Sequence, residues 1–318
     1  MTRLAYALVL CSACTYEYDL SHPDKDNTGP LDTAAPEEPT DTAAPAEEEE
    51  EEEPEADSAD VGEEIDPDTG SAPEQSDPPA EDDCTDTSDK VYVISRDDSA
   101  LYLFDPPTLS FTRLARLDCG TSQTPGSMAV ARDGVAYVRY ADDSLYAVDL
   151  ETYDCIETTY RDRAFGSFGM GYATNSGDTW RDQLYVANED QLAVLDPSTW
   201  TLTDLGRMPS QSELTGNAEG ELWAILPLES PAQLVQVDKD HGDVLETIRM
   251  PSFPDPSDID TFAFATWGGS FWIFVRSYGM GESTDVYQVT GTGLFSKVSD
   301  NIGFDIVGAG VSTCAPTE

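Results

Sequence analysis

The sequence predicts an all-β fold, a β-propeller of five blades, and three observations support this prediction. An aromatic residue lies at the centre of five short apolar runs, and these aromatics recur every 38 to 49 residues. Repeats of about 40–50 residues with several short strands each are typical of propeller blades. Glycine and aspartate residues typical of turns flank the runs at matching positions. The first unit lacks an innermost strand, and the C-terminal segment has the pattern of one. The runs are Val91-Tyr92-Val93, Ala136-Tyr137-Val138, Leu184-Tyr185-Val186, Leu222-Trp223-Ala224 and Phe271-Trp272-Ile273.

The first two strands of each unit are expected to form a hairpin. A glycine precedes three of the aromatics by three residues, at Gly134, Gly220 and Gly269. Glycine tolerates the positive φ that tight hairpin turns require. Small or apolar residues precede these turns, and small residues suit innermost strands that crowd around a central axis. These segments are 127–130, 168–172, 214–216 and 262–265.

The third strand of four units ends in aspartate, and the fifth copy ends in Thr290. An aspartate at the first turn position accepts backbone N–H bonds, and a following proline presets the next φ. A fourth strand then carries charged side chains, as expected of an exposed sheet edge. The aspartates are Asp105, Asp149, Asp196 and Asp238, and the outer strands are expected at 111–117, 155–160, 202–208, 244–250 and 294–298.

The two ends of the repeat region predict how the ring closes. The first unit begins at its second strand, at Val91, with no innermost strand before it. Residues 306–314 have the pattern of an innermost strand with nothing after it. The C-terminal strand should therefore complete the first blade. This count gives five blades, with six as the main competitor.

Four cysteines follow the N-terminal segment, and an even number in an exported chain suggests disulfides. Cys84 precedes the second strand of the first blade and Cys314 ends its first strand, so a Cys84–Cys314 bond is geometrically natural. Cys119 and Cys155 then pair by elimination. The expected strand order puts them nearer opposite faces, so this pairing requires the loop 120–126 to bend inward.

Residues 1–14 have the features of a lipoprotein-type signal peptide. Arg3 provides a positive charge, residues 4–10 are apolar, and Ser12-Ala13 precedes Cys14. Seven apolar residues are too few to span a bilayer. We expect lipidation at Cys14, with Cys11 as the alternative. An ordinary secretory signal or a misplaced start codon would also fit this segment.

Residues 15–83 are expected to be a disordered acidic tether. The segment is rich in Pro, Thr, Ala, Asp and Glu and contains seven consecutive glutamates. It offers almost no apolar surface to offset its chain entropy. Residues 15–89 hold 29 acids and one base. Binding of calcium or of a basic partner is a second interpretation of this charge.

The propeller region, 84–318, contains no pattern that points to a catalytic residue. Residues 90–318 hold 34 acids and 14 bases, which argues against nucleic acid and against direct binding to an anionic membrane. His241 is the one histidine of this region, and no nucleophile, phosphate-loop or zinc-protease motif occurs. The expected inner strands present Met128, Met170, Leu214 and Phe264 at their centres, and no pair of acids is evident there.

The turns between second and third strands are repeatedly acidic and should share one face of the ring. Calcium or a cationic partner could bind there, and the plainer interpretation is that turns of an acidic protein are acidic. No other cofactor is expected. The candidate calcium ligands are Asp97, Asp98, Asp142, Asp143, Glu189 and Asp190.

Four segments resemble those of uncharacterised exported lipoproteins that are abundant in myxobacterial genomes. The segments are 168–171, 213–216, 263–269 and 307–316, and the resemblance spans about residues 84–318. It implies a propeller behind a lipoprotein signal and an acidic linker, and it carries no catalytic residues.

These observations together predict a monomeric protein on the outer membrane or cell surface, or alternatively a secreted one. Its propeller would be a non-enzymatic binding or scaffolding module for a surface protein or glycan. The alternatives are a polysaccharide hydrolase or lyase and a Ca²⁺-stabilised adhesion protein.

Overall fold

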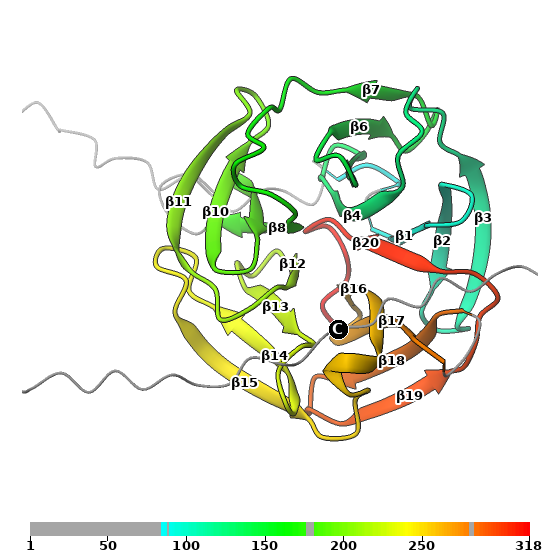
Figure 1. The fold of residues 1–318 in the computed structure, drawn as a ribbon, viewed down its shortest axis with the longest axis vertical. Coiled ribbons are helices and arrows are strands. Elements are labelled where there is room, and N and C mark those ends of the chain that lie inside the picture. Colours follow the sequence, from blue (N-terminus) through cyan, green and yellow to red (C-terminus); the bar gives the residue numbers. More distant parts are fainter. Residues whose placement is uncertain (1–83, 88, 176–180, 280–282) are drawn as a thin grey trace, which may run out of the picture. The chain divides into compact units, whose positions relative to one another are not determined.

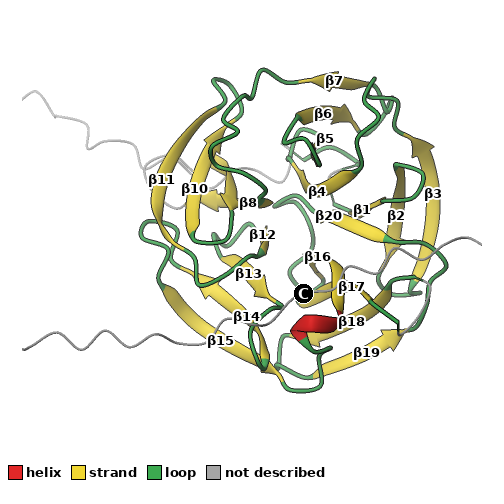
Figure 2. Ribbon diagram, viewed as in Figure 1, coloured by secondary structure: helices red, strands yellow, loops and turns green. Residues whose placement is uncertain are grey.

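Five four-stranded antiparallel sheets are arranged in a ring around a central axis, as Figure 1 shows for the computed structural model. The structure describes residues 84–87, 89–175, 181–279 and 283–318. All of these belong to one compact unit, Thr69–Glu318. Among the described residues, no helix has the length and apolar character needed to cross a membrane. Strands dominate the ring, and Figure 2 shows the short helical turn Pro256–Asp258 in red.

The predicted five-bladed propeller is confirmed, because the described strands form five four-stranded sheets, and in each sheet the strands follow one another from the axis outward. Blade 2 contains β4 (Pro125–Val130), β5 (Val135–Tyr140), β6 (Leu145–Asp149) and β7 (Cys155–Glu157). Blade 3 contains β8 (Gly169–Asn175), β9 (Arg181–Ala187), β10 (Gln191–Asp196) and β11 (Thr201–Arg207). Blade 4 contains β12 (Glu213–Gly216), β13 (Leu222–Leu226), β14 (Ala232–Val237) and β15 (Val244–Met250). Blade 5 contains β16 (Ile259–Trp267), β17 (Ser270–Ser277), β18 (Asp285–Thr290) and β19 (Phe295–Ser299).

The C-terminal strand completes blade 1, as its sequence pattern predicts. This blade contains β20 (Ile306–Gly310), β1 (Val91–Ser95), β2 (Ala100–Asp105) and β3 (Ser110–Arg116). Strand β20 pairs antiparallel with β1, with Val93 opposite Ala309. A disulfide joins Cys84 to Cys314. The first blade is thus built from both ends of the described chain.

A second disulfide, Cys119–Cys155, ties the segment after β3 to the outer strand of blade 2. The chain between these strands bends enough to bring the two Cα atoms within 5.0 Å. The outer strand β7 is shorter than the sequence suggests and ends at Glu157. Beyond it the chain turns inward, where Tyr160 is buried and its hydroxyl donates to the Asp162 carbonyl.

The repeated aromatics pack between neighbouring blades. Trp272 of blade 5 contacts Phe104 of blade 1 with ring centroids 5.3 Å apart. The ring centroids of Tyr137 of blade 2 and Tyr172 of blade 3 are 6.3 Å apart. Packing of this kind buries apolar surface at each blade interface, so the aromatics stabilise the ring.

Small residues let the innermost strands approach closely. A Cβ on Gly171 would lie 2.6 Å from the Leu214 carbonyl oxygen, and one on Gly308 would lie 2.9 Å from the Met128 nitrogen. Real Cβ atoms do not come so close to backbone, so these positions require glycine. The close approach narrows the axis and brings the first residues of the inner strands together at one end.

Candidate functional site

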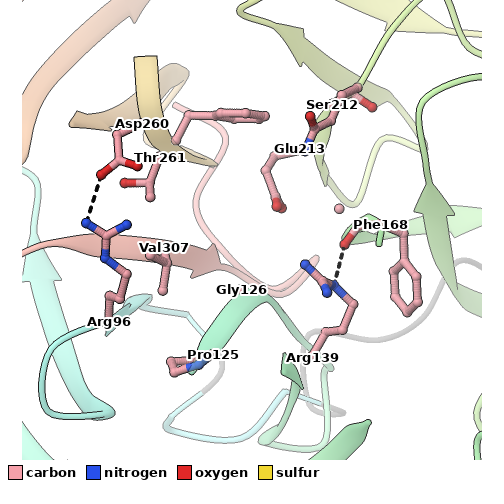
Figure 3. Close-up of a pocket in the computed structure, with 13 residues that line it drawn as sticks. Arg96, Pro125, Gly126, Arg139, Phe168, Ser212, Glu213, Asp260, Thr261 and Val307 are labelled. Carbon is pink, nitrogen blue, oxygen red and sulfur yellow. Dashed lines mark hydrogen bonds and ion pairs between the residues drawn. The ribbon is translucent and has the colours of Figure 1, made fainter. Parts of the chain in front are cut away.

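A cavity of about 200 Å³ lies on the axis at the end where the five innermost strands begin. Figure 3 shows charged side chains entering it from several blades. Each blade contributes at least two residues to its wall. The lining consists of Arg96 and Val307 of blade 1, Pro125, Gly126 and Arg139 of blade 2, Phe168 and Gly169 of blade 3, Gln211, Ser212 and Glu213 of blade 4, and Asp260, Thr261 and Phe262 of blade 5.

Glu213, the first residue of β12, is a buried carboxyl group in this wall. It is 6 % exposed, and the Ser127 hydroxyl donates to its Oε2 over 2.8 Å. Burial raises the pKa of Glu213 to about 8, although Ser127, Arg139 and the Met170 backbone N–H favour the charged form. The side chain is therefore protonated at neutral pH, and it can both donate and accept a hydrogen bond.

The Arg139 guanidinium, carried by β5, approaches the same cavity (Figure 3). Its Nε donates to the Phe168 carbonyl over 3.0 Å, and its Nη1 donates to the Tyr140 carbonyl over 3.2 Å. Nη1 also lies 3.5 Å from an Asp143 carboxylate oxygen. Burial lowers the pKa of Arg139, although the nearby carboxyl groups oppose this, and arginine remains charged in proteins.

One nitrogen of Arg139 is left available. Among the described residues, Nη2 has no hydrogen-bond acceptor. A Cβ at position 126 would lie 2.7 Å from it, so Gly126 leaves open the space in front of this nitrogen. The cavity therefore contains a buried cationic donor that faces open space.

Ser212 adds a second available group. It is 1 % exposed, and its Oγ has no hydrogen-bond partner among the described residues. A buried hydroxyl without a partner costs about 1–3 kcal/mol, so a ligand that engages it recovers this energy.

Four charged groups at the blade 1–blade 5 side of the cavity neutralise one another. Arg96 lies 2.8 Å from carboxylate oxygens of both Asp260 and Asp305, and Arg276 contacts the same two carboxylates. Burial raises the pKa of Asp260, but hydrogen bonds from Arg96, Tyr278 and Arg276 outweigh it and lower the pKa overall. Asp260 is therefore ionised and already paired.

The opposite end of the axis is closed by a different network. Arg132 follows β4 and lies 3.0 Å from an Asp182 carboxylate oxygen. Thr174 donates to Asp182 over 2.8 Å, Thr313 contacts Asp182 as well, and Arg132 also donates to Thr313 over 2.9 Å. Arg132, Asp182, Thr174 and Thr313 thus hold one another in place through side-chain hydrogen bonds.

The sequence-based search of the inner strands for acids was wrong on one point. Met128, Met170, Leu214 and Phe264 are buried as expected. However, β12 begins at Glu213 and β16 begins at Ile259, so Glu213 and Asp260 line the axial cavity. Both lie at strand starts, outside the apolar centres that the repeat pattern highlights. An acid directly before a run of small residues is the signal that could have identified Glu213.

The six candidate calcium ligands lie in turns at the same end as the cavity but are not gathered there. Within the described ranges, no three His, Cys, Asp or Glu residues form a group that could hold a metal ion. Asp98 pairs with Arg113 over 3.0 Å, Asp142 accepts from Ser144, and Asp143 contacts Arg139. Asp97, Glu189 and Asp190 are exposed.

The remaining predicted positions fall into two groups. Cys84, Cys314, Cys119 and Cys155 form the two disulfides described above. Cys14, the predicted lipidation site, lies outside the described residues, as does the acidic segment 15–83.

Comparisons with known proteins name no family for this chain. No protein-family model matches, and no curated protein matches by sequence. A catalytically inactive virginiamycin B lyase from Staphylococcus aureus, crystallised with quinupristin, is 9 % identical, with a TM-score of 0.40 over 69 % of each chain. A Bacteroides thetaiotaomicron protein of unknown function is 13 % identical, with a TM-score of 0.44 over 70 % of this chain and 64 % of that one. A Bacteroides caccae protein of unknown function is 8 % identical, with a TM-score of 0.41 over 70 % and 98 %.

Proposed function

We propose that the propeller is a non-enzymatic binding module and that it takes its ligand in the axial cavity. The observation that carries this proposal is the wall itself, because all five blades converge on one cavity that offers available polar groups. Among the described residues, the buried Ser212 hydroxyl has no hydrogen-bond partner, and Nη2 of the largely buried Arg139 side chain has no acceptor. Buried polar atoms are normally hydrogen-bonded, so these two favour a bound partner.

Display on the cell surface completes the proposal. The two disulfides indicate an oxidising, extracytoplasmic compartment. A lipid on Cys14 and a long acidic segment would hold the propeller away from the membrane. Mass spectrometry of the mature protein tests the anchor: we expect a diacylated or triacylated Cys14 at the N-terminus, and an unmodified N-terminus would refute it.

The binding proposal is tested by blocking the cavity mouth. Gln211 lines the cavity and is exposed, so Gln211→Trp should narrow the mouth without disturbing the buried chain. Gln123 is also exposed and precedes an innermost strand, but it does not line the cavity. Gln123→Trp is therefore the matched control. A thermal-shift and glycan-array screen should yield a ligand that Gln211→Trp loses and Gln123→Trp retains.

A polysaccharide hydrolase is the second candidate, and one observation favours it. A protonated Glu213 and an ionised Asp260 line the same cavity, and glycosidases use a carboxylic acid with a carboxylate. Against this, Asp260 is held by two arginines, which leaves it poorly placed to attack a sugar. Release of reducing ends that Asp260→Asn and Glu213→Gln both abolish would establish the hydrolase and refute the non-enzymatic proposal.

A further inference from the structure

The available hydrogen-bonding groups of the axial cavity are a guanidinium nitrogen, a hydroxyl and a neutral carboxyl group, and each of them can donate to an anion. We propose that the cavity binds the carboxylate of a small organic acid between Arg139, Ser212 and Glu213. This inference rests on the proposed binding function and names the chemistry that the site recognises.

Arg139 supplies the charge. Its side chain is 9 % exposed, and Asp143 forms an ion pair with it: a carboxylate oxygen of Asp143 lies 3.5 Å from Nη1, whereas Nη2 is the available nitrogen. Nη2 can donate a charge-assisted hydrogen bond to one carboxylate oxygen, and such bonds are about twice as strong as neutral ones. A carboxylate in front of Nη2 would compensate this buried cation.

Ser212 and Glu213 supply neutral donors. The Ser212 hydroxyl is buried, lines the cavity and has no partner among the described residues. The Glu213 carboxyl is neutral at pH 7 and carries a proton that it can donate to an anion. Figure 3 shows the Glu213 and Arg139 side chains pointing into the cavity from blades 4 and 2.

The remaining charges around the cavity do not oppose an anion strongly. Glu213 is faced by Ser127 on β4, Arg139 on β5 and the Met170 N–H on β8. Across the cavity, Asp260 and Asp305 are neutralised by Arg96 and Arg276. The net negative charge of the chain acts from farther away and is screened over about 8 Å at physiological salt.

The size of the cavity limits what enters. A volume of about 200 Å³ is smaller than pockets for drug-sized ligands, which span roughly 300–1,000 Å³. A single small acid, or the acidic end of a longer chain, fits this limit. An acidic sugar and a peptide C-terminus share the same carboxylate, so the experiment uses one probe of each kind.

The test measures binding to the full-length chain by calorimetry at pH 6.5. The probes are glucuronate and N-acetylalanine, with glucose and N-acetylalanine amide as neutral counterparts. At least one acid should bind about ten-fold or more tightly than its neutral counterpart, since a charge-assisted hydrogen bond contributes about 1.5–3 kcal/mol. The acid that binds more tightly identifies the source of the carboxylate.

Two variants locate the binding. Ser212→Ala should weaken binding of the acid about three- to ten-fold and leave the melting temperature equal or higher, because it removes an unsatisfied buried hydroxyl. Ser210→Ala is the matched control: its hydroxyl is also buried without a partner among the described residues, but it does not line the cavity. This control should bind like the parent chain.

The pH dependence tests the role of Glu213. Binding should weaken as the pH rises above about 8, where Glu213 ionises and repels the anion. Glu213→Gln should abolish that pH dependence, because its amide stays neutral.

Equal affinity for acids and neutral counterparts, tighter binding of inorganic phosphate, or equal effects of Ser212→Ala and Ser210→Ala would each overturn the inference. If the acids fail to bind while Gln211→Trp blocks a neutral ligand, the binding function survives and only the carboxylate inference falls. If Gln211→Trp blocks no ligand at all, both proposals fail.

Discussion

The two ends of the propeller axis are built from the same five innermost strands, but their polar side chains differ in how far they are hydrogen-bonded. At one end Arg132, Asp182, Thr174 and Thr313 satisfy one another and close the ring. At the other end Arg139 Nη2 and Ser212 lack partners among the described residues and border a cavity. The paired network stabilises the fold, whereas the unpaired groups cost stability. We propose on this ground that the open end binds the ligand.

The largest loss of stability is expected from removing the disulfide Cys84–Cys314, which lies at the closed end and joins the two chain segments of blade 1. Its sequence separation is 230 residues, and chain-entropy models give about 5 kcal/mol as an upper bound for such a loop. Replacing both cysteines by serine should therefore lower the melting temperature strongly. Calorimetric unfolding measures this loss.

The second disulfide provides the comparison for that experiment. Cys119–Cys155 closes 36 residues, for which the same model gives about 4 kcal/mol at most. Its double serine variant should be the less destabilised of the two. An unchanged melting temperature of the variant without Cys84 and Cys314 would contradict the view that this disulfide stabilises the closed ring.

Breaking the Arg132–Asp182 pair should have the next largest effect. The two side chains are 17 % and 11 % exposed, so Asp182→Ala leaves a largely buried cation without its partner. The free energy of unfolding should fall by about 2–4 kcal/mol in urea titrations. Asp98→Ala is the control, because its pair with Arg113 is 39 % and 48 % exposed and should contribute less than about 1 kcal/mol. Similar losses in both variants would contradict the view that the closed end is a buried structural network.

At the open end, Glu213→Gln should stabilise the protein near neutral pH. The pKa of Glu213 rises from about 4.5 to about 8 on folding, so between these values the unfolded chain releases a proton that the folded chain retains. The free energy of unfolding therefore falls as the pH rises through this window. Glu213→Gln removes this term, with a gain on the order of 3 kcal/mol at pH 7 and almost none near pH 4. Melting curves of both proteins at the two pH values measure it, and an equal gain at pH 4 would exclude titration of Glu213 as the cause.

The smallest effect is expected from calcium. Asp98, Asp142 and Asp143 are engaged with protein groups, and no three acids of the described chain converge on one point. EDTA followed by excess Ca²⁺ should leave the melting temperature unchanged. A clear rise of the melting temperature on adding Ca²⁺ would contradict this expectation and would support a calcium site in the acidic turns.

The sequence predicts the ring well because its signals repeat. The aromatics at blade interfaces, the glycines of the inner hairpins and the unmatched end strands together establish five blades and their closure. Each signal depends on local backbone geometry or burial, which recurs in every blade. Tyr92 and Tyr185, two of the repeated aromatics, are buried in the structure.

The cavity could not be predicted in the same way, because its residues do not repeat. Arg139 lies on a second strand, Glu213 begins a first strand and Ser212 precedes one. Only the closed ring brings Arg139 of blade 2 to the same wall as Ser212 and Glu213 of blade 4. The raised pKa of Glu213 likewise depends on burial by neighbouring blades. Contacts between residues of different blades cannot be predicted from the periodicity of the sequence.

The most direct test of the difference between the two ends is NMR mapping of backbone amides while glucuronate is added to the full-length chain. The signals of Gly126, Gly169 and Ser212 at the open end should shift with a common dissociation constant, and those of Thr174 and Thr313 at the closed end should stay in place. Shifts at the closed end, or no shift at the open end with any ligand from the screen, would contradict the assignment of the axial cavity as the binding site.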